Sequence, residues 1–183
     1  MPTGRLGGTL FQIDLVKYPD TFLRAKSEEV KFPLDDKTQR LIKWMIKSMY
    51  SNYGIGLAAV QVGYHSRIFV MDCTRAGKSP QTFINPTVTK KSEETLTDFE
   101  GCLSAPGKRG EVERHLRITL NYKDEEGEEH TKTFYDLEAR CIQHELDHLE
   151  GKLCIDYEKG KYSRDKHKSQ TMVESDFRAK SDT

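Results

Sequence analysis

The stretch that organises the rest of the chain is Gln-His-Glu-Leu-Asp-His-Leu at residues 143–149, which contains the pattern His-Glu-x-x-His. It lies in a run over residues 137–149 that has neither glycine nor proline, so we expect a helix there. Residues four apart share one face of a helix, so His144 and His148 can direct two imidazole nitrogens at one point. Glu145 lies one residue away and can reach a water molecule bound at that point, as a general base must.

The residues expected to face inward on this helix fall in two rows, the second of them apolar. One row contains Leu137, Cys141, His144 and His148, and the other contains Ile142, Leu146, Leu149 and Leu153. A helix with two such rows is expected to be buried, with its histidines facing inward. Asp136 is the expected N-cap, and Gly151 is expected to end the helix.

The His-Glu-x-x-His pattern alone has two competing interpretations. Two histidines four apart also occur in helices as ordinary core or surface residues. A catalytic metal site of this type needs a third protein ligand and keeps one position open for water. The rest of the chain must therefore supply that third ligand.

The composition describes a single domain with a heavily charged surface. The 183 residues are 36% hydrophobic and 32% charged, which is enough chain to bury a core of its own. Basic and acidic residues number 29 each, so there is no global positive field to attract nucleic acid. No apolar run has the length of a membrane span. We therefore expect neither nucleic acid nor a membrane as a partner.

The cysteines indicate a reducing compartment. They are Cys73, Cys102, Cys141 and Cys154, and none of them forms a Cys-x-x-Cys pair. Residues 1–16 lack the uninterrupted apolar region of a secretory signal. We therefore expect reduced thiols and a cytoplasmic location. The first residues contain Arg5 and no acidic residue, so an organellar targeting sequence is the alternative.

The order of elements predicts an α+β fold, with antiparallel or mixed sheets packed around the C-terminal helix and a separate N-terminal helix. The expected elements are an irregular arm over residues 1–35, a helix from Asp35 or Asp36 to about Tyr53, strands over 67–72 and over 82–89 with a break at Pro86, a polar connection over 90–98, and a hairpin of 117–122 with 131–134. Residues 158–183 are polar, so we expect one domain over 1–157 and a flexible tail after it.

Residues 54–63 read Gly-Ile-Gly-Leu-Ala-Ala-Val-Gln-Val-Gly. Small residues at this density allow backbone to approach another element or a ligand closely. The stretch has no Gly-Lys-Ser/Thr and no third glycine at the dinucleotide spacing, which excludes a nucleotide loop. Gln61 is its one polar side chain, either solvated or turned toward a site as a donor.

Several residues compete for the place of the third ligand. Cys141 shares the histidine face but lies about 10.5 Å along the axis from His148, whereas a metal–sulfur bond spans only about 2.3 Å. Other candidates are Cys73, Cys154 and, in the polar tail, Glu158, His167 and Glu174. Cys102 lies between Gly101 and Leu103, a setting in which backbone can pass close to the helix and direct a thiolate at it.

Three motifs in this order resemble the signature motifs of the peptide deformylases. They are Gly-Ile-Gly-Leu-Ala-Ala-Val-Gln at 54–61, Glu-Gly-Cys-Leu-Ser at 100–104 and the stretch at 143–149. The resemblance runs from about Tyr18 to Tyr157. Val60 stands where many members have proline and Ala105 where a larger aliphatic residue is common, and neither falls on an expected ligand.

The resemblance implies an enzyme that removes the formyl group from the N-terminal formylmethionine of new polypeptides and releases formate. The implied metal ligands are Cys102, His144 and His148, holding one Fe(II) ion for which zinc, nickel or cobalt can substitute. Glu145 would be the general base, and Gln61 with the backbone N–H of Leu103 would form the oxyanion site.

The resemblance also implies the residues that bind substrate. Those expected to line the methionine pocket are Ile55, Leu137 and Cys141. The backbone at Gly56 and the side chain of Arg109 would hold the peptide. Glu100 and Asp147 are expected as buried acids that orient a ligand or pair with Arg140.

The partners implied are N-formylmethionyl nascent peptides near the ribosome, bound by a monomer in the cytoplasm. One alternative is a zinc peptidase of the His-Glu-x-x-His class, with a downstream carboxylate as third ligand and no use for Cys102. The other is a family member that has lost catalysis and serves as a metal-binding module. Glu145 and Gln61 argue against this second alternative, because a structural metal site needs neither a base nor an oxyanion donor.

Overall fold

The computed structural model describes residues 14–74 and 79–157. The predicted tail over 158–183 and residues 1–13 of the predicted arm lie outside the described residues. The described strands are β1 (Gly56–Ala58), β2 (Ile68–Met71), β3 (Gln81–Lys91), β4 (Thr95–Gly101), β5 (Arg109–His115), β6 (Arg117–Lys123) and β7 (Glu129–Tyr135). The helices are α1 (Asp36–Ser51), α2 (Asp136–Leu149) and three short 3-10 helices, η1 (Thr21–Arg24), η2 (Ala59–Val62) and η3 (Cys154–Tyr157).

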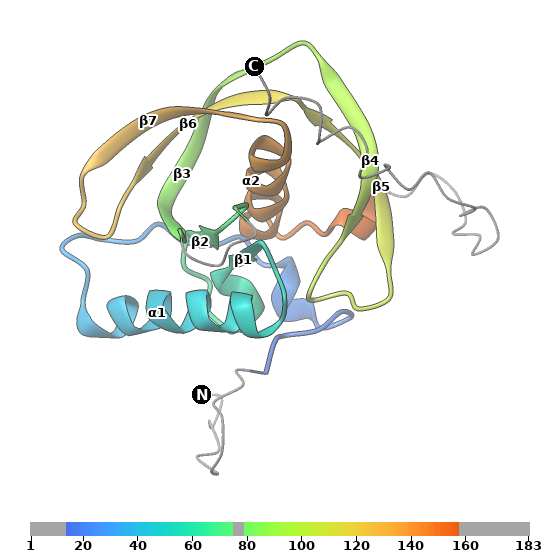
Figure 1. The fold of residues 1–183 in the computed structure, drawn as a ribbon. Helices are drawn as coiled ribbons and strands as arrows, with labels where there is room; N and C mark the ends of the chain where they lie inside the picture. The colour runs from blue at the N-terminus through green and yellow to red at the C-terminus, as the bar shows by residue number, and fades with distance from the viewer. Residues whose placement is uncertain (1–13, 75–78, 158–183) are drawn as a thin grey trace, which may run out of the picture.

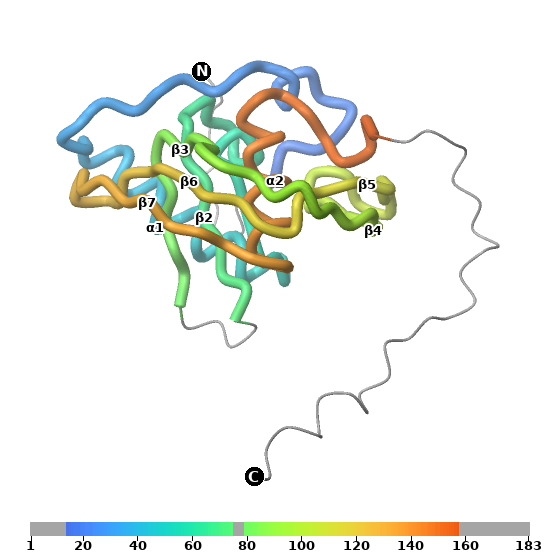
Figure 2. The backbone as a smooth tube through the Cα atoms, turned by 90° about the horizontal axis from the view of Figure 1, so that it is seen from above, coloured from blue at the N-terminus to red at the C-terminus, as the bar shows by residue number. Residues whose placement is uncertain are grey.

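Helix α2 lies in the middle of the fold, between two separate sheets (Figure 1). One sheet has the antiparallel order β1-β2-β3-β6-β7, and the other is the antiparallel pair β4-β5. Figure 2, seen from above, again places α2 between β6–β7 and β4–β5. The predicted α+β class around the C-terminal helix is confirmed, with antiparallel pairing between all the named strands. No helix in the described part of the chain is long and apolar enough to cross a membrane.

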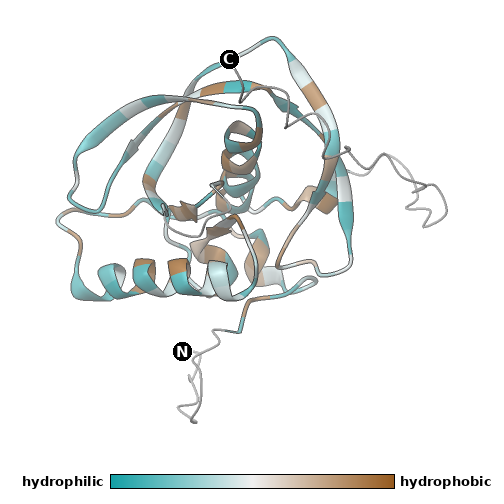
Figure 3. Cartoon of the chain, viewed as in Figure 1, coloured by the Kyte–Doolittle hydropathy of each residue, from teal (hydrophilic) through white to brown (hydrophobic). Residues whose placement is uncertain are grey.

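Strand β2, Ile-Phe-Val-Met, is buried on both faces because a helix covers each of them. Ile68 and Val70 pack in the cluster that contains the apolar face of α1, whereas Phe69 and Met71 pack in the cluster that contains α2. Successive side chains of a strand point to opposite faces, which explains the continuous apolar run. Figure 3 shows hydrophobic residues on the short strands beside α2, while both helices alternate between hydrophobic and hydrophilic residues along their length.

Helix α1 begins where the sequence predicts. Asp35 is its N-cap and accepts a hydrogen bond from the Thr38 N–H at 2.7 Å. The helix ends at Ser51, and the chain then turns at Tyr53, which has a positive φ of 57°. The described part of the predicted arm, residues 14–35, contains one turn of 3-10 helix, η1, and an isolated β-bridge from Glu28 to Ser66, and is otherwise irregular.

The predicted N-cap of α2 is wrong. Tyr135 takes the N-cap position without a side-chain hydrogen bond, and Asp136 is the first helical residue, with a φ of 46°. The physical reason is that β7 runs directly into α2. Tyr135 is still paired with Arg117 in the sheet, and the Asp136 N–H donates to the Leu116 carbonyl at 2.8 Å. Asp136 therefore turns the corner and cannot cap the helix.

The C-terminal end of α2 is as predicted. Gly151 has a φ of 71° and donates its N–H to the His148 carbonyl at 3.1 Å. The Lys152 N–H donates to the Asp147 carbonyl at 2.8 Å, which completes a Schellman motif. A methyl group at Gly151 would also overlap the backbone carbonyl of Arg24 in η1. This glycine therefore ends the helix and lets the N-terminal segment pack against it.

The predicted break at Pro86 is also wrong. Strand β3 runs through it as a bulge, with a shift of register against β6 between Ile84 and Thr87. Asn85 adopts a φ of 51°, and its side-chain amide exchanges two hydrogen bonds of 2.8 Å with the backbone of Val30. The bulge takes the proline out of the hydrogen-bond ladder, so the strand accommodates it.

The predicted polar connection over 90–98 and the region after it contain the pair β4–β5. Its ladder runs from Thr95 opposite His115 to Gly101 opposite Arg109. Six of the seven residues of β4 are exposed, so the strand lacks the apolar alternation by which strands are recognised. The predicted hairpin, by contrast, is confirmed as β6–β7.

Gly151→Ala tests how tightly the end of α2 packs. We expect a loss of about 2 to 4 kcal/mol in the free energy of unfolding, from the left-handed conformation and from the overlap with the Arg24 carbonyl. Gly63→Ala is the matched control, because Gly63 also has a positive φ, of 87°, but open space around it. The control should lose about 1 kcal/mol in urea unfolding. Equal losses in both variants would contradict the close packing of Gly151.

Candidate metal centre

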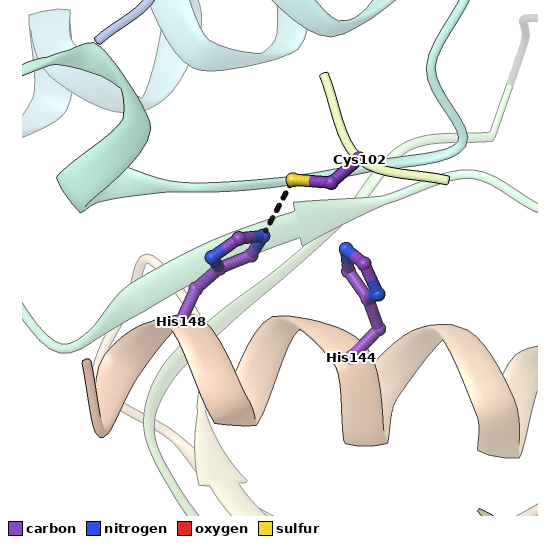
Figure 4. Close-up of side chains that lie close together, drawn as sticks. All are labelled: Cys102, His144 and His148. Atoms are coloured by element: carbon purple, nitrogen blue, oxygen red, sulfur yellow. Dashed lines mark hydrogen bonds between the residues drawn. The ribbon is translucent and has the colours of Figure 1, made fainter. Parts of the chain in front are cut away.

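Cys102, His144 and His148 converge on one point. Their ligand atoms all lie within 4.8 Å of one another, and no other group of three potential ligands is found in residues 14–74 and 79–157. Figure 4 shows both imidazole rings rising from α2 toward the Cys102 thiol, which is 3.2 Å from the His148 Nε2 atom. Cys102 directly follows β4, so the separate two-stranded sheet delivers the sulfur to the helix.

This donor set suits a divalent transition metal. One thiolate and two imidazoles are ligands that zinc and iron accept, and three protein ligands leave a position for water. The neighbouring Glu145 fits such a site. It is 3% exposed, and its Oε2 atom is buried with no hydrogen-bond partner among the described residues. A buried carboxylate oxygen without a partner is costly unless a further group, such as water, occupies the site.

Gln61 is buried and turned toward the cysteine. Its Oε1 atom accepts the Ala58 N–H at 2.8 Å, which fixes the side chain. Its Nε2 atom then points to the Cys102 sulfur at 3.6 Å and to the Ser104 hydroxyl at 3.1 Å. With Gln61 only 2% exposed, the solvated alternative is wrong, and the amide is turned inward.

Glu100 holds the first histidine in place. Its Oε2 atom lies 2.9 Å from the Nδ1 atom of His144, and this contact leaves the Nε2 atom of His144 for a metal ion. The expected pairing of Glu100 with Arg140 is present at 2.8 Å. Asp147, however, pairs with Arg114 at 2.7 Å and not with Arg140.

Arg114 is a residue that the sequence analysis missed. Its side chain is 6% exposed and donates two hydrogen bonds to Glu100, at 3.0 and 2.9 Å, as well as the one to Asp147. The alternating pattern of β5 could have predicted that Arg114 is buried. In this strand the buried residues are Gly110, Val112 and Arg114, and they alternate with exposed ones. An arginine in phase with such a row faces inward and needs buried acceptors.

Residues 16–18 form a second feature that the sequence did not indicate. The Val16 N–H donates to the Gln61 carbonyl at 2.8 Å, and the Tyr18 N–H donates to the Ser104 carbonyl at 2.7 Å. The Lys17 ammonium donates to the Leu103 carbonyl, also at 2.7 Å. This short segment therefore ties the backbone of Gln61 to the loop that carries Cys102.

The charges around the site shift several pKa values. Burial alone would raise the pKa of Glu100, but hydrogen bonds from His144 and Arg114 outweigh it and lower that pKa to about 2. Burial lowers the pKa of His148 well below its usual range, which keeps the imidazole neutral and able to bind a metal. Burial raises the pKa of Glu145 to about 7, a value suited to proton transfer near neutral pH.

Of the residues expected to bind substrate, Gly56 and Cys141 lie near Glu145, and Arg109 lies near Cys102. The Cys141 thiol points to the Ile55 carbonyl at 3.7 Å, and a methyl group on Gly56 would overlap both Cys141 and Glu145. Ile55 and Leu137 are 36% and 41% exposed, so the expectation that Leu137 is buried with the rest of α2 is wrong. Arg109 is exposed and lies opposite Gly101, next to Cys102.

Comparison with known proteins identifies the family. The sequence model of the polypeptide deformylase family matches residues 13–164. The chain belongs to that family. Peptide deformylases are metal-dependent hydrolases that remove the N-formyl group from nascent peptides, and the chain is an enzyme of this class.

Curated relatives and solved structures agree with this assignment. The chain is 46% identical to a peptide deformylase of Rhizobium meliloti (78% of this chain, 83% of the relative) and 49% identical to one of Pseudothermotoga lettingae (75% and 77%). Its fold is similar to the Thermotoga maritima peptide deformylase, with a TM-score of 0.74 and 38% identity over 80% of this chain and 97% of that one. An inhibitor complex of the Plasmodium falciparum deformylase gives a TM-score of 0.72 at 41% identity, covering 79% and 88%.

Arg114→Met tests the ion network beneath the deformylase histidines. We expect a loss of about 3 to 5 kcal/mol in the free energy of unfolding of the metal-saturated protein, because two buried carboxylates lose their shared cation. Arg24→Met is the control, since Arg24 pairs with Asp156 at the surface, where both side chains are more than a third exposed. The control should lose about 1 kcal/mol or less. Similar losses in both variants would show that the buried ion network of Arg114 contributes no more to stability than the surface ion pair of Arg24.

Proposed function

We propose that this deformylase binds one Fe(II) ion through Cys102, His144 and His148, and that zinc, nickel or cobalt can substitute for it. The observation that carries the proposal is the convergence of a thiol and two imidazoles beside the unpaired, buried carboxylate oxygen of Glu145. A bound divalent ion supplies Lewis-acid activation of water for attack on the formyl carbon.

The chain's own residues would then carry the proton and stabilise charge. Glu145 takes the proton of the attacking water and delivers it to the amine that leaves, so that water and the formamide become formate and a free N-terminus. The Gln61 amide and the Leu103 N–H donate to the oxygen that becomes negative in the transition state. Each such donor contributes about 3 kcal/mol. Because Ala58 and residues 16–18 fix the two donor segments, neither has to reorganise during the reaction.

The substrate would lie along β1 and the first turns of α2. We assign the methionine side chain to the apolar surface of Ile55, Leu137 and Cys141. The backbone at Gly56 and the Arg109 side chain hold the peptide. The exposure of Ile55 and Leu137 supports this assignment, because both side chains can be covered by a ligand.

The partners proposed are N-formylmethionyl nascent peptides near the ribosome, with the protein acting as a monomer in the cytoplasm. The catalytic domain is proposed to end near Tyr157. The peptidase alternative requires a downstream carboxylate, but its candidates Glu158 and Glu174 lie outside the described residues. No contact in the described residues favours that alternative.

Formate release from a formyl-methionyl peptide, measured on protein purified without oxygen, tests the activity and the ion together. We expect rapid release with about one iron per chain and a loss of activity in air, because Fe(II) and its thiolate ligand both oxidise. Activity that survives storage in air would favour zinc or nickel. A metal-loaded protein that releases no formate would overturn the proposed chemistry.

Cys102→Ser is expected to lose most of the bound metal, because a hydroxyl stays protonated where a thiol ionises. Metal content after dialysis is the measurement. Cys154→Ser is the control, since Cys154 is also buried but belongs to η3 and not to the ligand cluster. Full metal occupancy in Cys102→Ser would refute the ligand assignment.

Glu145→Ala is expected to keep its metal and lose about 10²- to 10⁴-fold in kcat, the usual contribution of a positioned base. Glu138→Ala, a change in the first turn of the same helix, serves as the control and should retain both metal and turnover. Near-normal turnover in Glu145→Ala would show that another group accepts the proton.

A further inference from the structure

Two thiols outside the ligand cluster meet beside α2. Cys73 follows β2 and is half-buried, whereas Cys141 lies on α2 and is 5% exposed. Cys73 packs against the core cluster that contains Cys141, and the two side chains are close enough for each to shift the pKa of the other. All four cysteines of the chain are free thiols in the structure.

A shared backbone carbonyl holds the two cysteine segments together. The Ile55 carbonyl accepts the Asp72 N–H at 2.9 Å and faces the Cys141 sulfur at 3.7 Å. The Asp72 carboxylate is held in turn by the Tyr50 hydroxyl at 2.6 Å and by the Thr74 N–H at 2.9 Å. The segment that carries Cys73 is therefore anchored on both sides of the cysteine.

The two thiols differ in access and in acidity. Contact with the Cys141 side chain outweighs the effect of burial and lowers the pKa of Cys73, while the same contact and burial raise the pKa of Cys141. Cys73 is thus the more exposed and more readily ionised member, and Cys141 is the shielded member beside it. An accessible, acidic thiol next to a second thiol is the usual arrangement of a cysteine pair that forms a reversible disulfide.

We propose that Cys73 and Cys141 form a redox-active pair, which a small-molecule disulfide such as oxidised glutathione converts to an intramolecular disulfide. The Cys73 thiolate attacks the glutathione disulfide, forms a mixed disulfide and releases one glutathione thiol. The Cys141 sulfur then attacks the Cys73 sulfur and releases the second. Two S–H bonds are exchanged for one S–S bond, and one glutathione disulfide is reduced to two thiols that carry the protons.

The effect on activity rests on the proposed function, because Cys141 and Ile55 are assigned there to the methionine pocket. A disulfide replaces the Cys141 thiol in the pocket wall and fixes the end of β2 to α2. Gly56 is packed so closely against Cys141 that a methyl group would not fit between them. A shift of the Cys141 sulfur therefore changes the shape of the wall, while Glu145 and the ligand cluster keep their places.

The disulfide can be tested without turnover. Full-length protein is loaded with zinc, because zinc does not consume the oxidant. It is then incubated with oxidised glutathione, alkylated in denaturant, digested with trypsin and analysed by mass spectrometry. We expect a linked peptide pair that contains Cys73 and Cys141, in the wild type and in the control Cys154→Ala. The pair should be absent from Cys73→Ser and should disappear on treatment with a thiol reductant. A stable glutathione adduct at Cys73, unchanged thiols, or a link to Cys102 would each overturn the proposal.

Kinetics on the same samples separate this proposal from the proposed function. In the oxidised wild type we expect KM for a formyl-methionyl peptide to rise about tenfold, the loss of roughly 1.4 kcal/mol of binding, with kcat and zinc content retained. Reduction should restore KM, and Cys73→Ser should not respond to the oxidant. If the disulfide forms and KM stays constant, the redox pair is established and the assignment of the methionine pocket is wrong.

Discussion

The carboxylate of Glu100 is the contact on which the site depends, because it joins the two-stranded sheet to α2. It comes from β4, next to the segment that carries Cys102, and it contacts His144 of α2 directly and Asp147 through Arg114. A carboxylate that is 7% exposed would be costly without compensating charges. Arg114 and Arg140 supply those charges, and the same contacts fix the orientation of one imidazole. Stability and ligand geometry thus have a common origin in this network.

The second constraint is close packing on a neighbouring face of the helix. The small residues of β1 and η2 let the backbone lie against α2, where Gly56 leaves room for Glu145 and Cys141. The same approach buries Gln61 and turns its amide toward the cysteine. A carboxyl with a pKa near 7 and a fixed amide donor therefore arise from one feature, a backbone without bulky side chains facing the helix.

The sequence predicted those features whose signal is local. His144, Glu145 and His148 lie within five consecutive residues, and their helix has a regular apolar pattern. Cys102 could be favoured but not assigned from its setting, because its partners are far away in sequence. Arg114 was missed for the same reason: its role depends on acids from β4 and α2.

The elements that the sequence predicted wrongly have a different cause. At each of them, tertiary contacts override the local preference of the residues. Asp136 is a good N-cap by residue type, but the sheet continues to Tyr135 and occupies the capping position. Pro86 is a good strand breaker, but the contact of Asn85 with Val30 supports a bulge that absorbs it. Strand β4 is held by its partner β5 and by Arg140, which donates to the Leu96 carbonyl, and so needs little apolar surface of its own.

The hydrogen bonds of residues 16–18 have a consequence for the protein's own synthesis. This early segment closes onto Gln61 and Ser104, and His148, the last member of the Cys102–His144–His148 cluster, comes near the end of the described chain. Contacts of such long sequence separation form slowly, since they must overcome the entropy of closing large loops. During translation the Cys102–His144–His148 cluster therefore cannot assemble until α2 has left the ribosome. An enzyme that acts on nascent chains thus brings these three side chains together only when almost all of its described residues have been synthesised.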